Sequence, residues 1–371
     1  MGYTLKSKEN AVRIINLLVL WIAPLTITAQ GYRYEVIDLT AKYGLNPIAS
    51  FVDINNHGTM VGEDGEGRGI VIENGVLSVL ERPKGALEYY AFAINDNGVI
   101  LGQGRFGTGS TPQKSILWIN GKAVVPDVSP AVGNLGQGPL NALNNKGIFG
   151  GYDAGTGLPI LWSESKGVSY LNVPAGYRGG ANGINDEGQL SGVLTDGIVQ
   201  PRAFRWIGGA PENIHPAGYA QSRALAIAGN GDIGGYVTTS NAFHGGFWRG
   251  GTEFVDIGTL TPEDYTWFGD LNGQEQVVGQ ATVDGVFSAY FWERGTLHNL
   301  DALANPTASA HFVGASAINE FGQILAGGAY PSGAGAIFLL NPVPEPSGLV
   351  VLLAAVGATI WRGIKSPKAR K

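Results

Sequence analysis

The feature that most constrains this chain is a short phrase that occurs seven times, at intervals that average about 44 residues. Each copy has Ile or Leu, then Asn, two variable residues and Gly, followed by apolar residues and a second Gly. The copies begin at Ile54-Asn55, Ile94-Asn95, Leu143-Asn144, Ile184-Asn185, Ile227-Ala228, Leu271-Asn272 and Ile318-Asn319. Ala228 replaces Asn in the fifth copy, and Glu275 replaces Gly in the sixth. Such a period is typical of repeat folds, in which no unit can bury its apolar surface alone.

A second phrase follows each first phrase after about 17 to 23 residues. It is apolar and usually ends in Trp, as at Trp118, Trp162, Trp206, Trp248 and Trp292. A Gly and a third short apolar phrase commonly come next. We interpret each unit as two hairpins, with Asn-x-x-Gly as one turn, because Asn and Gly tolerate left-handed φ. Four short strands in about 44 residues match one blade of a β-propeller.

The ends of the repeated region indicate how the ring closes. The last unit stops at Leu339-Leu340 without a third phrase, whereas the region opens on an unmatched strand at 34–39. The composition, with 58 Gly and only 15% charged residues, suits many short strands joined by tight turns. The sequence therefore predicts an all-β, seven-bladed β-propeller of four-stranded blades over residues 31–341, closed by the N-terminal strand.

The repeated region also resembles a known family. The order of the Ile-Asn-x-x-Gly element and an aromatic-Trp strand, as in Phe247-Trp248 and Phe291-Trp292, resembles the HAF-repeat family over nearly all of 34–340. The His-Ala-Phe triplet itself does not occur, and Arg202-Ala203-Phe204 is the nearest match. The resemblance implies an extracellular location and no established chemistry.

Residues 1–30 have the three parts of a secretory signal peptide. Basic residues up to Arg13 precede an apolar run from Ile14 to Ala23, and mostly small residues follow to Ala29. We predict cleavage after Ala29 or Gln30. The alternative is an uncleaved membrane anchor, for which the apolar run is shorter than the roughly 20 residues that a span needs.

Residues 342–371 form a second targeting segment. Pro344-Glu345-Pro346 precedes an apolar stretch from Gly348 to Trp361, and Arg362 opens a basic cluster. As a helix, this stretch spans about 21 Å, short of a hydrocarbon core of roughly 30 Å. Trp361 suits the membrane interface, and Arg362 marks a membrane stop on the cytoplasmic side. The segment therefore predicts a short transmembrane helix that holds the chain only transiently.

The order of Pro-Glu-Pro, apolar helix and basic cluster resembles the PEP-CTERM sorting signal of Gram-negative-type bacteria. The resemblance implies export, recognition by an exosortase-type processing protease, transient inner-membrane association through the tail, and removal of that tail. It further implies delivery to the cell envelope or extracellular matrix, often together with exopolysaccharide, surface proteins and biofilm. A plain C-terminal anchor is the alternative.

Charge and cysteine content exclude several classes of function. Eight of the 24 basic residues but only two of the 30 acidic ones lie in the end segments, so residues 31–341 hold 16 basic and 28 acidic residues, a net of −12. Such a body repels phosphate backbones, and we expect no nucleic-acid partner. Because the chain has no Cys, it has no disulfides, no thiol chemistry and no Cys-based zinc site.

The sequence predicts no catalytic residue, no metal site and no cofactor. The five histidines lie in different repeats without ligand spacing: His57, His215, His244, His298 and His311. A metal site assembled across blades stays an alternative. The segments 53–58 and 95–98 weakly resemble calcium loops, but we interpret both as turns. Gly102-x-Gly104-x-x-Gly107 matches a dinucleotide pattern, yet no helical pattern follows it.

The tryptophans give one candidate ligand contact. The five that recur at equivalent strand positions are expected in the core, whereas Trp267 breaks the pattern and is a candidate for stacking against a ligand, with packing between blades as the alternative. We therefore expect a non-catalytic surface propeller that binds a polysaccharide or another protein. The alternatives are an envelope polysaccharide lyase or hydrolase on a propeller, and a structural module with no specific ligand.

Overall fold

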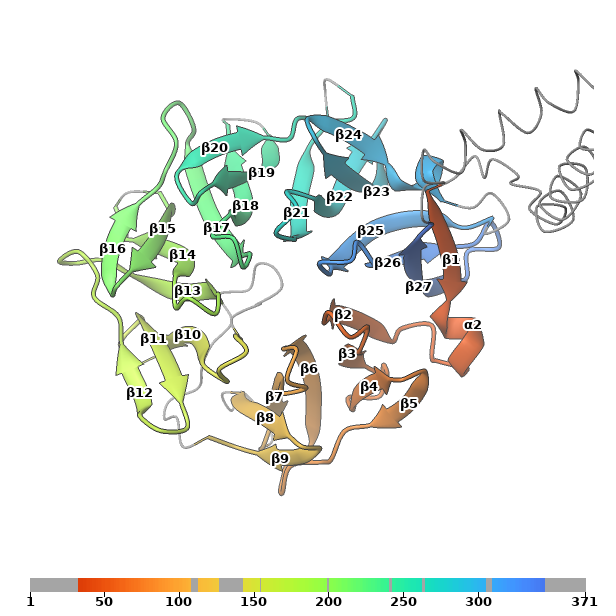
Figure 1. Cartoon of the computed structure of the whole chain (residues 1–371), viewed down its shortest axis with the longest axis horizontal. Helices are drawn as coiled ribbons and strands as arrows, with labels where there is room; N and C mark the ends of the chain where they lie inside the picture. Colours follow the sequence, from red (N-terminus) through yellow and green to blue (C-terminus); the bar gives the residue numbers. More distant parts are fainter. Residues whose placement is uncertain are drawn as a thin grey trace, which may run out of the picture.

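The computed structural model describes residues 33–107, 113–126, 143–153, 155–198, 200–239, 242–261, 264–304 and 309–343. Seven antiparallel sheets, the blades, are arranged as a ring around a common axis (Figure 1). The predicted seven-bladed propeller is therefore confirmed. The predicted signal peptide and the residues of the predicted sorting segment from Pro344 onward lie outside the described residues.

The first four blades follow one another along the chain. Blade 1 consists of β2 (Ser50–Ile54), β3 (Met60–Glu63), β4 (Gly69–Glu73) and β5 (Val76–Val79). Blade 2 consists of β6 (Glu88–Ile94), β7 (Ile100–Arg105), β8 (Lys114–Ile119) and β9 (Lys122–Val124). Blade 3 is described by β10 (Phe149–Asp153), β11 (Leu158–Ser163) and β12 (Gly167–Tyr170). Blade 4 consists of β13 (Arg178–Ile184), β14 (Leu190–Thr195), β15 (Arg202–Ile207) and β16 (Ala210–Asn213).

The remaining blades complete the ring. Blade 5 consists of β17 (Gln221–Ile227), β18 (Ile233–Thr238), β19 (Phe243–Arg249) and β20 (Glu253–Asp256). Blade 6 consists of β21 (Thr266–Leu271), β22 (Val277–Val283), β23 (Val286–Glu293) and β24 (Thr296–Asn299). Blade 7 consists of β25 (His311–Ile318), β26 (Ile324–Ala329), β27 (Gly335–Pro342) and β1 (Tyr34–Asp38). Two short helical turns, α2 (Leu39–Tyr43) and η1 (Leu300–Leu303), lie beside β1 and β24.

The ring closes by pairing the two ends of the described chain. Strand β1 pairs antiparallel with β27, from Tyr34 opposite Pro342 to Asp38 opposite Phe338. The Val343 N–H then donates to the Arg33 carbonyl oxygen at 2.8 Å. The predicted closure by the N-terminal strand is confirmed, and the pairing continues slightly past residue 341, where we expected the body to end.

The core lies between neighbouring blades, and the repeated tryptophans fill it. The side chains with no exposed surface include those of Trp118, Trp206 and Trp248. Each of these indoles also has a hydrogen-bond partner, as where Trp118 Nε1 donates to the Glu81 carbonyl oxygen at 2.8 Å. The indole thereby ties its strand to the connection that enters the blade, which confirms that these tryptophans are structural.

The turns follow the predicted pattern with one difference in mechanism. The left-handed residue of each Asn-x-x-Gly turn is its Gly, as at Gly58 with φ 75°, while the repeated Asn is not among the residues with positive φ. The expectation that Asn serves through left-handed φ is therefore wrong. In the sixth copy Glu275 takes the left-handed place at φ 55°, and its carboxylate accepts two hydrogen bonds from Arg249.

A β-bulge recurs in the innermost strand of every blade whose innermost strand is described. In blade 1 the register shifts between Phe51 and Asp53, and the equivalent shift occurs in blades 2, 4, 5, 6 and 7. A bulge adds one residue to one strand and re-aims the side chains after it. Where the residue just after the bulge is Asp, as at Asp53 in blade 1 and Asp270 in blade 6, its carboxylate reaches the backbone of the next blade.

Candidate functional site

The repeated Asn caps its own turn. Asn55 Oδ1 accepts hydrogen bonds from the N–H groups of His57 at 3.0 Å and Thr59 at 2.9 Å. The same caps recur at Asn144, Asn272 and Asn319. Because a short amide side chain can reach backbone N–H groups two and four residues ahead, this position favours Asn without any need for left-handed φ.

The same side chain also joins neighbouring blades. Asn55 Nδ2 donates to the Asn95 carbonyl oxygen at 3.0 Å, and Asn95 Nδ2 donates to the Asn144 carbonyl oxygen at 2.8 Å. Equivalent bonds run from Asn144 to Asn185, Asn185 to Ala228, Asn272 to Asn319 and Asn319 to Asn55. We call these side chains the asparagine belt. It is interrupted at Ala228, which has no amide to donate to blade 6.

The residue after each belt position forms a second ring, the rim. Its members are Asn56, Asp96, Asn145, Asp186, Gly229, Gly273 and Glu320. Asn56 N and Nδ2 both donate to the Asp96 carboxylate, at 2.9 and 3.0 Å, and Asn145 makes the same pair of bonds to Asp186. Amides and carboxylates thus alternate around one part of the rim. The two glycines leave a gap in it over blades 5 and 6.

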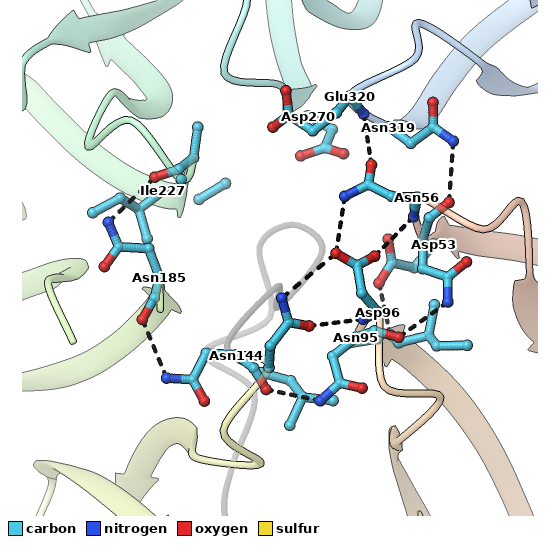
Figure 2. Close-up of a pocket in the computed structure, with 18 of the residues that line it drawn as sticks. Asp53, Asn56, Asn95, Asp96, Asn144, Asn185, Ile227, Asp270, Asn319 and Glu320 are labelled. Atoms are coloured by element: carbon cyan, nitrogen blue, oxygen red, sulfur yellow. Dashed lines mark hydrogen bonds between the residues drawn. The ribbon is translucent and has the colours of Figure 1, made fainter. Parts of the chain in front are cut away.

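Belt and rim surround a cavity of about 340 Å³ at one mouth of the channel (Figure 2). The described residues in its lining contain five carboxyl groups, from Asp53, Asp96, Asp186, Asp270 and Glu320, and no Lys, Arg or His. We call this cavity the channel mouth, and the side of the ring that carries it the turn face. Because an ionised carboxylate only accepts hydrogen bonds, the rim groups Asp96, Asp186 and Glu320 make the channel mouth rich in acceptors.

Two of these carboxylates are buried in the channel wall. Asp53 accepts a hydrogen bond from Ile94 N in blade 2 at 2.7 Å, and Asp270 accepts one from Ile318 N in blade 7 at 3.0 Å. Burial raises the pKa of Asp53 to about 7, although its backbone hydrogen bonds act in the opposite direction. The pKa of Asp270 is raised well above its ordinary value, first by burial and then by the charge of Asp53.

A larger cavity, of about 720 Å³, lies on the turn face between blades 2 and 3. Its apolar lining includes Val99, Leu117 and Trp162, which also belong to the hydrophobic cluster between these blades. We therefore assign this space to the packing of the two blades and treat the channel mouth as the candidate site.

The predicted ligand contact Trp267 lies in an aromatic cluster between blades 5 and 6. Its ring stacks on Phe243, with centroids 4.2 Å apart and planes at 23°, and meets Tyr236 edge-on at 5.2 Å. Phe243 therefore covers one face of the indole. This arrangement matches the alternative that we gave, packing between blades.

His215 and Ser222 form a Ser-His contact, and such a pair can be a nucleophile and its base. His215 Nδ1 lies 2.7 Å from Ser222 Oγ, and His215 Nε2 lies 2.8 Å from Arg202. Since Arg only donates, Nε2 must accept, which leaves the proton of a neutral imidazole on Nδ1, directed at Ser222. Burial and Arg202 lower the pKa of His215, and Ser222 has no exposed surface. In this geometry the His donates to Ser instead of removing its proton.

The remaining site predictions concern calcium loops, metal ligands, a membrane helix and the sorting motif. The segments 53–58 and 95–98, considered as calcium loops, form belt turns in which the Asn oxygens cap backbone N–H groups. Over the described ranges, no three His, Asp or Glu side chains group as metal ligands would. Nor do those ranges contain a helix with the length and apolarity for crossing a membrane. Pro344, Glu345, Pro346, Trp361 and Arg362 lie outside them.

Sequence reasoning missed the belt and the rim. The repeated Asn was recognised, but its bonds to the next blade depend on residues about 40 or more positions away. One feature of the sequence could have indicated these bonds. Six of the seven repeats have Asn at this position, although a turn alone also accepts other residues.

Comparison with known proteins finds only distant similarities. No protein-family model matches the sequence, and no curated protein matches it. Among solved structures, TolB from Acinetobacter baumannii is similar at 11% identity and a TM-score of 0.40, over 82% of this chain and 67% of that chain.

Two further similar structures are carbohydrate-related proteins. An ulvan lyase, a polysaccharide lyase, matches at 10% identity and a TM-score of 0.32, over 82% of this chain and 81% of its own. The Aleuria aurantia lectin matches at 11% identity and a TM-score of 0.30, over 86% of this chain and 98% of its own. At such values the likeness carries no information about what this chain binds.

Proposed function

We propose that this protein is an exported, non-catalytic binding propeller whose channel mouth holds a hydroxyl-rich, uncharged or cationic ligand. The observation that carries the proposal is the lining of the channel mouth, whose described residues include five carboxyl groups and no cationic side chain. An acceptor-rich cavity suits a ligand that brings its own donors, and sugar hydroxyls are such donors. The same charge opposes polyanions, so the ligand in this proposal is a neutral or amino sugar.

The rim offers an opening through which such a ligand can enter. Gly229 has no atom within 4 Å of the place where a Cβ would lie, so its missing side chain leaves open space. At Gly273 a Cβ would lie 3.2 Å from both carboxylate oxygens of Glu320, which accept from Gly273 N. The first glycine widens the entrance, and the second lets a rim carboxylate approach the backbone.

The test of this proposal compares two substitutions in one turn. Asp186→Asn removes a carboxylate from the cavity lining, whereas Glu187→Gln makes the same change of charge at an exposed neighbour. On an array of neutral, amino and acidic glycans, we expect binding to neutral or amino sugars. We expect Asp186→Asn to weaken it by roughly tenfold, as for the loss of one hydrogen bond to a charged group, and Glu187→Gln to leave it unchanged.

Three results would contradict the proposal. They are an absence of glycan binding, a loss of acidic-glycan binding in Asp186→Asn as large as the loss of neutral-glycan binding, and equal effects of the two substitutions. Release of new reducing ends from an exopolysaccharide would instead favour the alternative, a polysaccharide lyase or hydrolase.

We further propose that the chain is sorted to the cell surface by an exosortase-type system, with exopolysaccharide or surface proteins as neighbours there. The support is the order of features in the sequence, with a signal peptide at 1–30 and Pro344-Glu345-Pro346 before an apolar segment and Arg362. The intact mass of the exported protein tests it, since both ends should be missing. A mass that retains residues 347–371 would refute tail removal.

A further inference from the structure

A second cavity lies on the opposite side of the ring, which we call the loop face. Its volume is about 270 Å³, and blades 3, 4 and 5 all contribute to its walls. Arg178 is the first residue of β13, whereas the turn that carries Asp186 follows the last residue of the same strand. A strand of this length spans about 20 Å, so the two cavities lie at opposite ends of the blade.

The charge of this cavity is the reverse of that of the channel mouth. Arg178 and Arg223 line it, and none of the other described residues in its walls carries a carboxylate. None of the ion pairs among the described residues includes either arginine. In a body with a net charge of −12, two arginines that face one cavity without an acidic partner form a local positive site.

Packing holds both arginines toward the cavity. The side chain of Arg178 lies across Gly157, where a Cβ would come within 3.1 Å of Arg178 Cδ. The Gly179 N–H donates to the Gly157 carbonyl oxygen at 2.9 Å, which fixes the start of β13 against the neighbouring blade. On the other side, Arg223 hydrogen-bonds with Tyr236, whose ring packs on Trp267. Both positions are therefore preorganised before any ligand arrives.

We propose that this arginine pocket binds the anionic group of an acidic saccharide, either a uronate carboxylate or a sulfate ester. Guanidinium groups recognise both anions through paired, charge-assisted hydrogen bonds. Tyr152 and Thr195 add hydroxyls to walls that are otherwise mainly apolar, which suits a sugar ring beside the anion. The volume of about 270 Å³ lies just below the usual range of ligand pockets and suits about one sugar residue.

This site goes beyond the proposed function and depends on no part of it. The channel mouth opposes anions, and the arginine pocket attracts them, so the two cavities divide saccharides by charge. A chain with both sites can hold two kinds of sugar residue, one on each face of the ring.

The test uses the full chain in mild detergent and three small probes. The probes are methyl β-glucuronide, glucose 6-sulfate and, as the neutral match, methyl β-glucoside, with binding followed by titration calorimetry. We expect one or both acidic sugars to bind, the tighter one identifying the anion, and methyl β-glucoside to bind at least tenfold more weakly to this pocket.

Substitutions assign the binding to the pocket. Arg178 is exposed, so Arg178→Gln leaves folding intact and should weaken the acidic sugars by roughly tenfold. Arg178→Lys keeps the charge but loses the paired geometry and should cause a smaller loss. Lys84→Gln, at an exposed position outside the pocket, is the matched control and should change nothing. Asp186→Asn should also leave binding of the acidic probes unchanged.

The proposal is overturned if neither acidic probe binds, if Arg178→Gln weakens methyl β-glucoside as much as it weakens the acidic probes, or if Arg178→Gln and Lys84→Gln have the same effect on the acidic probes. A loss with Asp186→Asn but not with Arg178→Gln would place anion binding at the channel mouth and overturn it as well. Failure of neutral glycans to bind would affect only the proposed function.

Discussion

The connections between strands differ in how much their lengths vary on the two faces of the ring. On the turn face, every described connection between the first two strands of a blade has five residues, from 55–59 in blade 1 to 319–323 in blade 7. On the loop face, connections between the second and third strands vary, from two residues between β22 and β23 to eight between β7 and β8. The connections on the turn face have a constant length because their side chains must reach the next blade. The connections on the loop face vary in length because they do not carry this repeated contact.

Charge separates the faces in the same way. The turn face repeats one arrangement of amides and carboxylates, and five acidic side chains line its channel mouth. The loop face carries the cavity with Arg178 and Arg223, which belongs to three blades only and has no sevenfold counterpart. The comparison teaches that the repeated turn residues join the blades to one another and line the channel mouth, whereas the arginine pocket depends on residues that do not repeat.

The largest expected effect comes from removing what both faces share, the closure of the ring. Deleting residues 31–40 removes β1, including Tyr34, which is 2% exposed and packs edge-on against Phe291. The deletion exposes the whole edge of β27, so we expect it to destabilise the fold by more than the roughly 3–5 kcal/mol of a large core truncation. Thermal melting measures this, and an unchanged melting temperature would contradict the closure by β1.

The next effect is a dependence of stability on pH that differs between the faces. The folded-state pKa of Asp53, on the channel, is about 7 against an ordinary 3.8, so the folded state binds the proton more tightly than the unfolded state does. The contribution of Asp53 to the free energy of unfolding is therefore fully present at low pH and is lost as pH rises from about 4 to 7. This loss amounts to about 4 kcal/mol at most. Asp53→Asn should remove this part of the pH dependence in urea titrations.

Asp64, on the loop face, should show the opposite sign. Burial favours its neutral form, but hydrogen bonds from the Glu66 and Arg68 N–H groups and from the Arg68 side chain outweigh it, so the pKa is lowered. Its contribution is present above the ordinary value of 3.8 and is lost as pH falls below it. If Asp53→Asn and Asp64→Asn change the pH profile in the same direction, this contrast between the faces is wrong.

A smaller effect distinguishes a belt residue from a loop-face residue. Asn319→Ala removes the bond to the Asn55 carbonyl oxygen in blade 1 and the caps on the Phe321 and Gln323 N–H groups, which lose the partner that Asn319 supplies. We expect a loss of about 2–3 kcal/mol in the free energy of unfolding. Glu66→Ala removes only a solvent-exposed ion pair with Arg68 and should cost less than about 0.5 kcal/mol. Equal losses in chemical denaturation would show that the belt does not stabilise the ring.

The smallest effect is a gain. Ala228→Asn completes the belt, but Asn230 already donates to the Gly273 carbonyl oxygen at 3.0 Å and partly replaces the missing bond. We therefore expect a stabilisation of only about 0.5–1 kcal/mol. Ala228→Asp is the matched control, because it can cap the turn but cannot donate to blade 6. A gain of equal size in both variants would assign the effect to the cap rather than to the bond between blades.

Much of the fold could be predicted from the sequence because the information is local and repeated. Seven copies of Asn-x-x-Gly and the recurring Trp positions predict the blades, and the unmatched strand at 34–39 predicts the closure. Local patterns did not predict the β-bulges, since a bulge is a difference in register between two strands and leaves no period of its own.

The candidate sites could not be predicted from local patterns either, because their residues lie far apart in the sequence. Asp53 and Asp270 are 217 positions apart in sequence, yet the charge of one raises the pKa of the other. Trp267 stood out in sequence because it breaks the repeat, and the structure places it against Phe243 and Tyr236.

The sequence by itself determined the number of blades, the turns between their strands and the end that closes the ring, because each of these depends on residues close together in the chain or on their repetition. Only the tertiary structure decided that the repeated Asn bonds the blades to one another. It also decided that carboxylates collect at one mouth of the channel and that two arginines face a cavity on the other side. These arrangements join side chains from different blades, and their distances are set by ring closure, which no segment of the chain encodes alone.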